Sequence, residues 1–422
     1  MNKDLQHRRT VLWLLLPIAG LTFLNGIDRL NLSFAGQQLS QSIHLSPSQF
    51  GMGVSAFFVA YLLFQYPHAL LLRRLGIRTW LFISIVGWGI AGVMMSRVQT
   101  LADLLAARLL LGAAEAGFAP GMTWFISQWT PRATRARAMA ITLGAIPVSL
   151  VVGGPLCGAL LGMQNPLGLE PWRWMFLVAA LPNFLIAFVA AAWFVDRPSQ
   201  ARWLRGEAGI ELESRIVAES TLSSTTALRF GLAIRDGRIW LCAAVWLLTM
   251  TGAYALVFWL PQIVRNMALA QSEWLIGSLS ALPQLGLLAG LYFNARHSDR
   301  HDERFGHTAA GAALAGIALA ASLYAPSSTV ALGLLVAAGF GLGAAQGVFW
   351  TLPPALGIGG GQVPVGVISA ISMAGTAGGI IGPYMLGHLR ESTGTHDAGL
   401  LLLSGCLVLG AALLMIWRRP TT

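Results

Sequence analysis

Twelve apolar stretches, each near twenty residues long, follow one another along this chain. A run of that length is typical of a helix that spans the hydrocarbon core of a bilayer, where backbone groups must find their hydrogen bonds within the protein. With 55% hydrophobic and only 10% charged residues, the chain is predicted to be an all-α integral membrane protein. The twelve predicted transmembrane helices cover residues 11–35, 48–72, 78–96, 101–128, 136–162, 173–195, 237–264, 271–294, 306–324, 328–352, 363–389 and 398–417.

The basic residues predict how these helices are oriented. An even number of spans places both termini on the same side of the membrane. Most of the 27 Lys and Arg residues lie in the terminal segments and in the loops on that same side. By the positive-inside rule, both termini and the long central loop are predicted to be cytoplasmic. The basic residues form no continuous stripe, so the net charge of +10 does not predict a nucleic-acid partner.

A polar segment at residues 196–236 divides the chain into two halves, residues 1–195 and 237–422. Each half contains six of the predicted helices. The segment is predicted to be a tether, and the alternative is that its charged part forms a helix on the membrane surface.

The two halves share a local pattern. Gly154-Pro155 in the fifth predicted helix recurs as Gly382-Pro383 in the eleventh. Such an internal repeat is typical of carriers built from two related bundles. We therefore predict two pseudo-symmetric six-helix bundles joined by a cytoplasmic linker.

Four charged residues lie inside the apolar stretches of the first half: Asp28, Arg29, Arg108 and Glu115. Ionisable side chains at membrane depth are costly and are usually functional. Arg108 and Glu115 are seven residues apart, so they share a helix face about 10 Å apart along the axis. Asp28 and Arg29 are adjacent and point about 100° apart. The simplest arrangement has helix 11–35 facing helix 101–128.

The sum of these charges predicts how the site works. With both acids ionised the four groups are neutral, and each proton bound adds a positive charge that attracts a carboxylate. The carboxylate in turn favours proton binding, because linkage is reciprocal. Arg29 is the candidate for holding the carboxylate, since a guanidinium offers a bidentate fork and stays charged. The alternative is two salt bridges that only hold helices together.

Several motifs along nearly the whole chain resemble the major facilitator superfamily, and within it the anion:cation symporter family. They are Asp28-Arg29-Leu-Asn31, the string from Arg108 to Gly121, Trp129-Thr-Pro-Arg132, Trp259-Leu-Pro-Gln262 and His297-Ser-Asp299-Arg300. The resemblance implies a twelve-helix carrier of the bacterial plasma membrane that works by alternating access. It also implies proton-coupled transport of organic anions such as sugar acids, tartrate, phthalate and other aromatic acids. In the family, the acids matching Asp28 and Glu115 carry protons, and the arginine matching Arg29 binds substrate.

The C-terminal half supplies no intramembrane charge, so its contribution to the site is expected to be hydrogen bonding and stacking. Alignment with the family places Tyr61, Trp350 and the face of Ser372 and Thr376 along the substrate path. The alternative is ordinary packing, which is the commoner role of an aromatic residue at helical spacing. The full set of predicted substrate-binding residues is Arg29, Tyr61, Arg108, Gln262, Trp350, Ser372 and Thr376.

Charged loops on the predicted cytoplasmic side are candidates for a gate. The superfamily usually places an acid in the loop between the second and third helices, but this chain has only basic residues there, so an acid-based latch is not expected at that loop. The equivalent loop in the second half keeps its acid. The predicted gate residues are Arg73, Arg74, Arg135, Arg137, Asp299 and Arg300.

The loop after residue 294 also resembles a set of metal ligands. His297, His301 and His307 have helical spacing and are accompanied by nearby acids. Three arginines interleave with them, which favours a solvated charged loop that latches the gate. We therefore predict no metal site here.

Together these observations predict a proton-coupled symporter that imports an organic anion. Its expected partners are the anion, protons and lipid; no cofactor is expected, and a monomer would suffice. The polar loops contain no nucleophile–base arrangement, so an enzyme is not predicted. The alternative is a proton-driven antiporter that exports drugs or metabolites, although Arg29 and Arg108 are not expected in a site for lipophilic cations.

Overall fold

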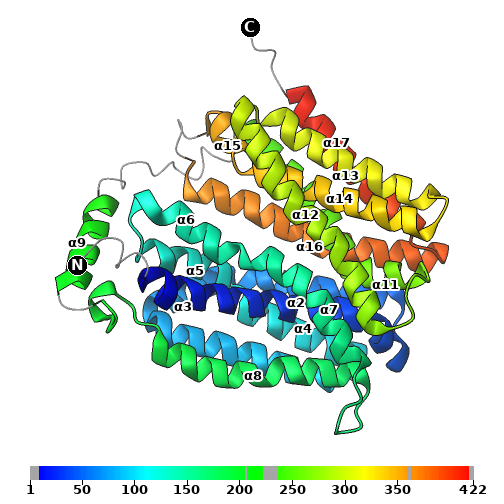
Figure 1. Ribbon diagram of the computed structural model, residues 1–422, viewed down its shortest axis with the longest axis horizontal. Coiled ribbons are helices and arrows are strands. Elements are labelled where there is room, and N and C mark those ends of the chain that lie inside the picture. The colour runs from blue at the N-terminus through cyan, green and yellow to red at the C-terminus, as the bar shows by residue number, and fades with distance from the viewer. Residues whose placement is uncertain (1–8, 205–206, 222–235, 359–362, 418–422) are drawn as a thin grey trace. The chain divides into compact units, whose positions relative to one another are not determined.

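The structure is a computed structural model that describes residues 9–204, 207–221, 236–358 and 363–417. Every regular element in these ranges is a helix (Figure 1), which confirms the all-α prediction. Ten of the helices found in the described ranges are long and apolar enough to cross a membrane. The number is ten and not twelve because one long helix contains two predicted spans and another span is split into two short helices.

The long helix is α3, Pro47–Ser96, whose backbone leaves the helical conformation at Gly76 with φ of 74°. Its two parts correspond to the predicted spans 48–72 and 78–96. The next predicted span is divided between α4, Leu101–Glu115, and α5, Phe118–Ser127. Neither of these is long enough to cross a bilayer alone.

The remaining predicted spans are also helical. A π-helical turn, Val11–Leu15, leads into the first of them, α2. Side-chain caps start several helices; Thr100 and Asp103 form a capping box at α4, for example. The helices are α2 (Leu16–Ser42), α6 (Arg132–Leu143), α7 (Ala145–Gly162), α8 (Pro171–Trp193), α11 (Gly237–Asn266), α12 (Glu273–His301), α13 (Phe305–Ala321), α14 (Ser328–Phe349), α15 (Leu352–Ala355), α16 (Val365–Thr393) and α17 (Asp397–Trp417).

The central polar segment contains one helix, α9, Glu207–Thr221. The charged part of the segment is therefore helical. The Glu219 carboxylate accepts a hydrogen bond from the backbone N–H of Arg132, 2.8 Å away, at the start of α6. The Ser/Thr-rich stretch that was predicted to be a tether lies almost entirely outside the described residues.

Contacts group the chain into two compact units. The first consists of Met1–Arg29, Val59–Leu150 and Arg173–Thr226, and the second of Leu30–Phe58, Val151–Trp172 and Ala227–Thr422. The boundaries between them fall inside α2, α3 and α7, in the first turn of α8, and after residue 226. The division at residues 196–236 into two six-helix bundles stays a prediction.

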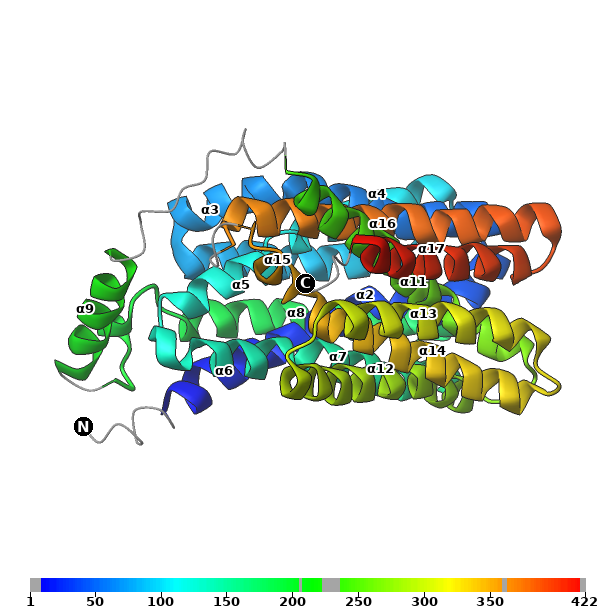
Figure 2. The same ribbon diagram turned by 90° about the horizontal axis from the view of Figure 1, so that it is seen from above.

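In the second unit, α12 and α13 both pack on α14, while α11 packs on α16 and α17 (Figure 2). Glycines allow the closest approaches between its helices. A Cβ added at Gly154 of α7 would lie 2.3 Å from the carbonyl oxygen of Gly277 in α12, and one at Gly382 would lie 2.3 Å from the carbonyl oxygen of Thr251. Only glycine fits at such distances. Both copies of the repeated Gly-Pro pair therefore mark tight helix crossings.

Candidate functional site

The position of two charged residues depends on how α4 is built. Arg108 lies inside this helix and Glu115 is its last residue. The break that follows contains Gly117, where an added Cβ would lie 2.3 Å from the Cβ of His68 on α3. Pro120 then falls in the first turn of α5, where its missing N–H costs no helical hydrogen bond. The helix therefore ends with its carboxylate directed into the packed interior of the first unit.

Arg29 of α2 meets Glu115 directly. Its Nε atom donates a hydrogen bond to Oε2 of Glu115 at 2.7 Å. The Glu115 side chain is fully buried, whereas that of Arg29 is 24% exposed. Arg108 is also buried and interacts electrostatically with both residues. The predicted facing of the first helix and the fourth is thus confirmed.

Asp28 points to a different helix. Its Oδ2 atom accepts a hydrogen bond from Nδ2 of Asn183 on α8, at 3.1 Å. Asp28 and Glu115 still lie close enough to repel each other when both are ionised. The adjacent residues of α2 therefore address α8 and α4 separately, as the angle between them requires. Asn183 was not predicted from the sequence, although an amide inside an apolar run is a visible signal.

Tyr61 of α3 completes the surroundings of Arg29. The Cζ atom of Arg29 lies 4.7 Å from the centre of the tyrosine ring, which is a cation–π contact. A small cavity of about 50 Å³ in the first unit adjoins Arg29 and is also lined by Asn25 and Thr22. It has room for a few water molecules beside the guanidinium. The structure therefore brings Tyr61 to the predicted carboxylate-binding residue.

The net charge of the four intramembrane residues depends on whether their two acids are protonated. Asp28, Arg29, Arg108 and Glu115 sum to zero when both acids are ionised. A proton taken up by either acid leaves a net positive charge that a bound anion can neutralise. Electrostatic interactions of this kind are stronger inside a protein than in water. The geometry thus agrees with a site in which proton and anion binding depend on each other.

The predicted residues of the second unit fall into two groups. In the first, Oε1 of Gln262 on α11 accepts a hydrogen bond from Arg390 at 2.7 Å. Arg390 also lies over the ring of Trp259, 5.3 Å from its centre. A cavity of about 210 Å³ adjoins these residues. The sequence argument ended the eleventh helix at residue 389 and so left Arg390 outside it, but α16 continues to Thr393.

The second group surrounds Trp246 of α11, which the sequence argument did not single out. Trp350 is 39% exposed, and its ring lies 5.2 Å from that of Trp246. Trp246 also contacts α16 at Gly375, where an added Cβ would lie 2.4 Å from the indole. Ser372 and Thr376 lie on either side of that glycine in the sequence. The hydroxyl of Thr376 donates to the backbone oxygen of Ser372 at 3.1 Å, so it offers a ligand its acceptor side.

An acid does serve the loop between the two parts of α3. Asp196, three residues after the end of α8, accepts a hydrogen bond from the backbone N–H of Ile77 at 2.7 Å. Its carboxylate would also lie 2.7 Å from a Cβ added at Gly76. Arg73 and Arg74 are exposed just before this turn. The acid that is absent from the loop itself is therefore supplied by a residue more than a hundred positions away.

The other predicted gate residues are divided between bonded and exposed positions. Arg135 donates to backbone oxygens at the end of α5, while Arg137 is exposed. In the second unit, Asp299 forms a salt bridge with Arg304, and Arg300 is exposed. Their role in a gate stays a prediction.

Comparison with known proteins identifies related transporters. The family described as Major Facilitator Superfamily matches residues 18–383. A putative tartrate transporter of Agrobacterium vitis is 34% identical, over 99% of this chain and 96% of the relative. A quinolone resistance transporter of Acinetobacter baumannii is 33% identical, over 97% and 94%. Among solved structures, a bacterial homologue of the lysosomal transporter Spinster, inward-facing and occupied, aligns with TM-score 0.78 and 18% identity over 97% of both chains.

Proposed function

Since the chain belongs to the Major Facilitator Superfamily, we propose that it imports an organic anion together with protons, by alternating access. The protein is a multi-pass transporter of the bacterial inner membrane, and it is not an enzyme. The proposed substrate is a carboxylate such as tartrate, a sugar acid or an aromatic acid. The observation that supports this proposal most is the buried ion pair between Arg29 and Glu115.

That ion pair supports a competition between two carboxylates for one guanidinium. Glu115 occupies the Nε side of Arg29, one of the edges at which a guanidinium can bind a substrate carboxylate with two hydrogen bonds. When Glu115 takes up a proton, it loses its charge and holds Arg29 less strongly. Arg29 is then released to bind the anion. Proton and anion are therefore taken up together, and by linkage each increases the affinity for the other.

Asp28 is the second proposed proton site, held in place by Asn183. We assign protons as the coupling ion, with no cofactor. Arg108 would increase the positive potential of the site without touching the substrate carboxylate. The similarity to a putative tartrate transporter favours a compact hydroxylated dicarboxylate.

Selectivity among anions is proposed to come from the uncharged residues and from Tyr61. Trp350, with Ser372 and Thr376, would provide stacking and hydrogen-bond acceptors. Gln262 has an amide that can exchange its bond with Arg390 for one with a ligand. The proposed cytoplasmic gate is formed by Arg73, Arg74, Arg135, Arg137, Asp299 and Arg300, with both termini on the same side.

Uptake into proteoliposomes tests the proposal. Tartrate, a sugar acid and phthalate are compared with and without an inward proton gradient, for the wild type and Arg29→Lys. The lysine keeps the charge but loses the planar fork, so the apparent affinity should fall about 10- to 100-fold. If no organic anion is accumulated in response to the gradient, the proposal is refuted.

The relative named as a quinolone resistance transporter favours a second candidate, a proton-driven exporter. The two candidates differ in the direction of proton movement. A symporter acidifies the lumen as substrate enters, whereas an antiporter moves protons against the substrate. Adding tartrate or a quinolone to vesicles that contain a pH-sensitive dye distinguishes them.

A further inference from the structure

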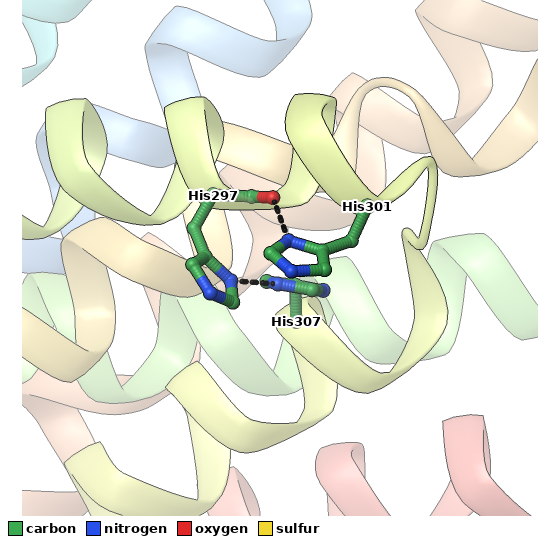
Figure 3. A group of neighbouring side chains, drawn as sticks. All are labelled: His297, His301 and His307. Carbon is green, nitrogen blue, oxygen red and sulfur yellow. Dashed lines mark hydrogen bonds between the residues drawn. The ribbon is translucent and has the colours of Figure 1, made fainter.

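Three histidines at the connection between α12 and α13 come together in space. His297 and His301 lie one turn apart near the end of α12, and His307 lies in the first turn of α13 (Figure 3). One ring nitrogen from each can be chosen so that all three lie within 4.8 Å of one another. The first two side chains are exposed and the third is half-buried, so an ion from solution can reach them. From the sequence, these residues were predicted to form a solvated charged loop with no metal site.

The rings of His301 and His307 are each oriented by a bond that Nδ1 makes. Nδ1 of His307 lies 2.8 Å from a carboxylate oxygen of Glu303, and Nδ1 of His301 lies 2.9 Å from the backbone oxygen of His297. Both oxygens are acceptors, so both Nδ1 atoms carry hydrogen in the neutral rings. The Nε2 atoms of His301 and His307 then carry no hydrogen, and each has a lone pair that can bind a metal ion. This is the arrangement in which a carboxylate or carbonyl orients a metal-binding imidazole.

The third ring faces the second directly. Nδ1 of His297 lies 2.6 Å from Nε2 of His307. Two nitrogens bound to one tetrahedral zinc ion at about 2.0–2.1 Å are separated by about 3.4 Å. If the exposed His297 ring rotates so that its Nδ1 atom moves away from His307 by somewhat less than an ångström, the two nitrogens reach the separation of two ligands of one metal ion. In the absence of a metal, the pair shares a proton instead.

The turn that presents these rings is held by its own bonds. Glu303 accepts hydrogen bonds from the backbone N–H groups of Gly306 and His307, at 2.7 and 3.0 Å, and so caps the start of α13. Arg304 bonds to Asp299 and to the hydroxyl of Ser298. The positive charge of Arg304 is thus neutralised locally, and a carboxylate stands directly behind His307. Both features favour the approach of a cation.

We propose that His297, His301 and His307 bind one first-row transition-metal ion of the class that prefers imidazole, such as zinc or nickel. Three nitrogen ligands leave a fourth position of the tetrahedron for water. The ion joins the end of α12 to the start of α13. This site involves none of the residues proposed to bind the organic anion.

Zinc binding to the purified full-length protein tests the proposal. The protein carries a purification tag without histidine, and binding is measured by equilibrium dialysis with metal analysis. The wild type should bind one zinc ion per chain, and the variant in which all three histidines are changed to Gln should lose that ion. His388→Gln, which removes an exposed histidine of α16, is the matched control and should keep it. Equal zinc content in the wild type and the triple variant would overturn the proposal.

Two further measurements separate ligation from structural damage. Glu303→Gln keeps the size of the side chain that orients His307 and should weaken zinc binding about 10- to 100-fold. Cobalt, which absorbs strongly in the visible region when tetrahedral, should give that signal with the wild type and lose it with His307→Gln. Thermal melting of each variant without metal shows whether it is folded. A folded His307→Gln variant with an unchanged cobalt spectrum would contradict the assignment of His307.

Discussion

Replacing Glu115 with Gln should separate anion binding from proton coupling. The variant keeps the shape of the side chain and an oxygen that can accept from Arg29 Nε, now at 2.7 Å from a carboxylate oxygen. A hydrogen bond to a charged partner contributes about 1.5–3 kcal/mol, and a neutral one about 0.5–1.5 kcal/mol. The hold on Arg29 is therefore weakened by about 1–1.5 kcal/mol. A substrate carboxylate that competes for the same guanidinium should bind about five- to tenfold more tightly in alkaline buffer.

Proton-driven accumulation should change in the opposite direction. Each proton carried along a gradient of one pH unit provides about 1.4 kcal/mol, which is about a tenfold accumulation. The variant should lose that factor for the proton assigned to Glu115, while exchange of labelled for unlabelled substrate continues. Calorimetry measures the affinity, and proteoliposome uptake measures the accumulation.

Both results are needed for the reasoning to hold. Glu211→Gln, which removes an exposed acid of α9, is the control and should behave as the wild type. Weaker anion binding by Glu115→Gln would refute the competition for Arg29. Undiminished accumulation in the proton gradient would refute the role of Glu115 as a proton carrier.

Three other changes have expected outcomes. Tyr61→Phe should keep the affinity for the anion, whereas Tyr61→Leu removes the ring over Arg29 and should weaken binding up to about tenfold, as measured by calorimetry. Gly277→Ala should lower the melting temperature, because its Cβ would lie 2.1 Å from the Gly154 oxygen and overpacking costs about 1–3 kcal/mol; Gly333→Ala, with nothing within 4 Å, should not. Burial lowers the pKa of His396 from 6.5 to about 4, so the neutral form is favoured in the folded protein and the free energy of unfolding should fall by up to about 1.4 kcal/mol per pH unit below 6.5. His396→Gln should reduce this pH dependence in thermal melts. An unchanged dependence in the variant would show that His396 is not its source.

Much of the fold could be predicted because hydrophobic length alone specifies a membrane helix. In the residues that the structure describes, all twelve apolar stretches are helical apart from short breaks and a few end residues. The boundaries within them were harder to predict. At the break after Glu115, Gly117 packs closely against His68, and such a contact between helices has no signature in the local sequence.

The charged part of the site was predicted more fully than the polar part. The four intramembrane charges stand out because ionisable residues are rare in apolar runs. Asn183 and Trp246 carry no charge, and the rotation of α8 and α11 about their axes decides that Asn183 meets Asp28 and that Trp246 meets Trp350. Asp196 and Ile77 meet because two distant segments end at the same place. The three histidines show the same limit. Because arginines alternate with them in the sequence, the pattern indicated a solvated loop, whereas the turn between α12 and α13 brings the three rings together.

The arrangement of Asp28 and Arg29 makes α2 a mechanical link. The two residues are neighbours on one rigid helix, yet one is bonded to α8 and the other to α4. The division between the two compact units falls directly after Arg29, so this helix belongs to both. Any rotation of α2 about its axis must disturb both bonds in the same movement. The bond that Asp28 accepts and the bond that Arg29 donates to Glu115 are therefore mechanically coupled through α2, and so are the two acids proposed to carry protons.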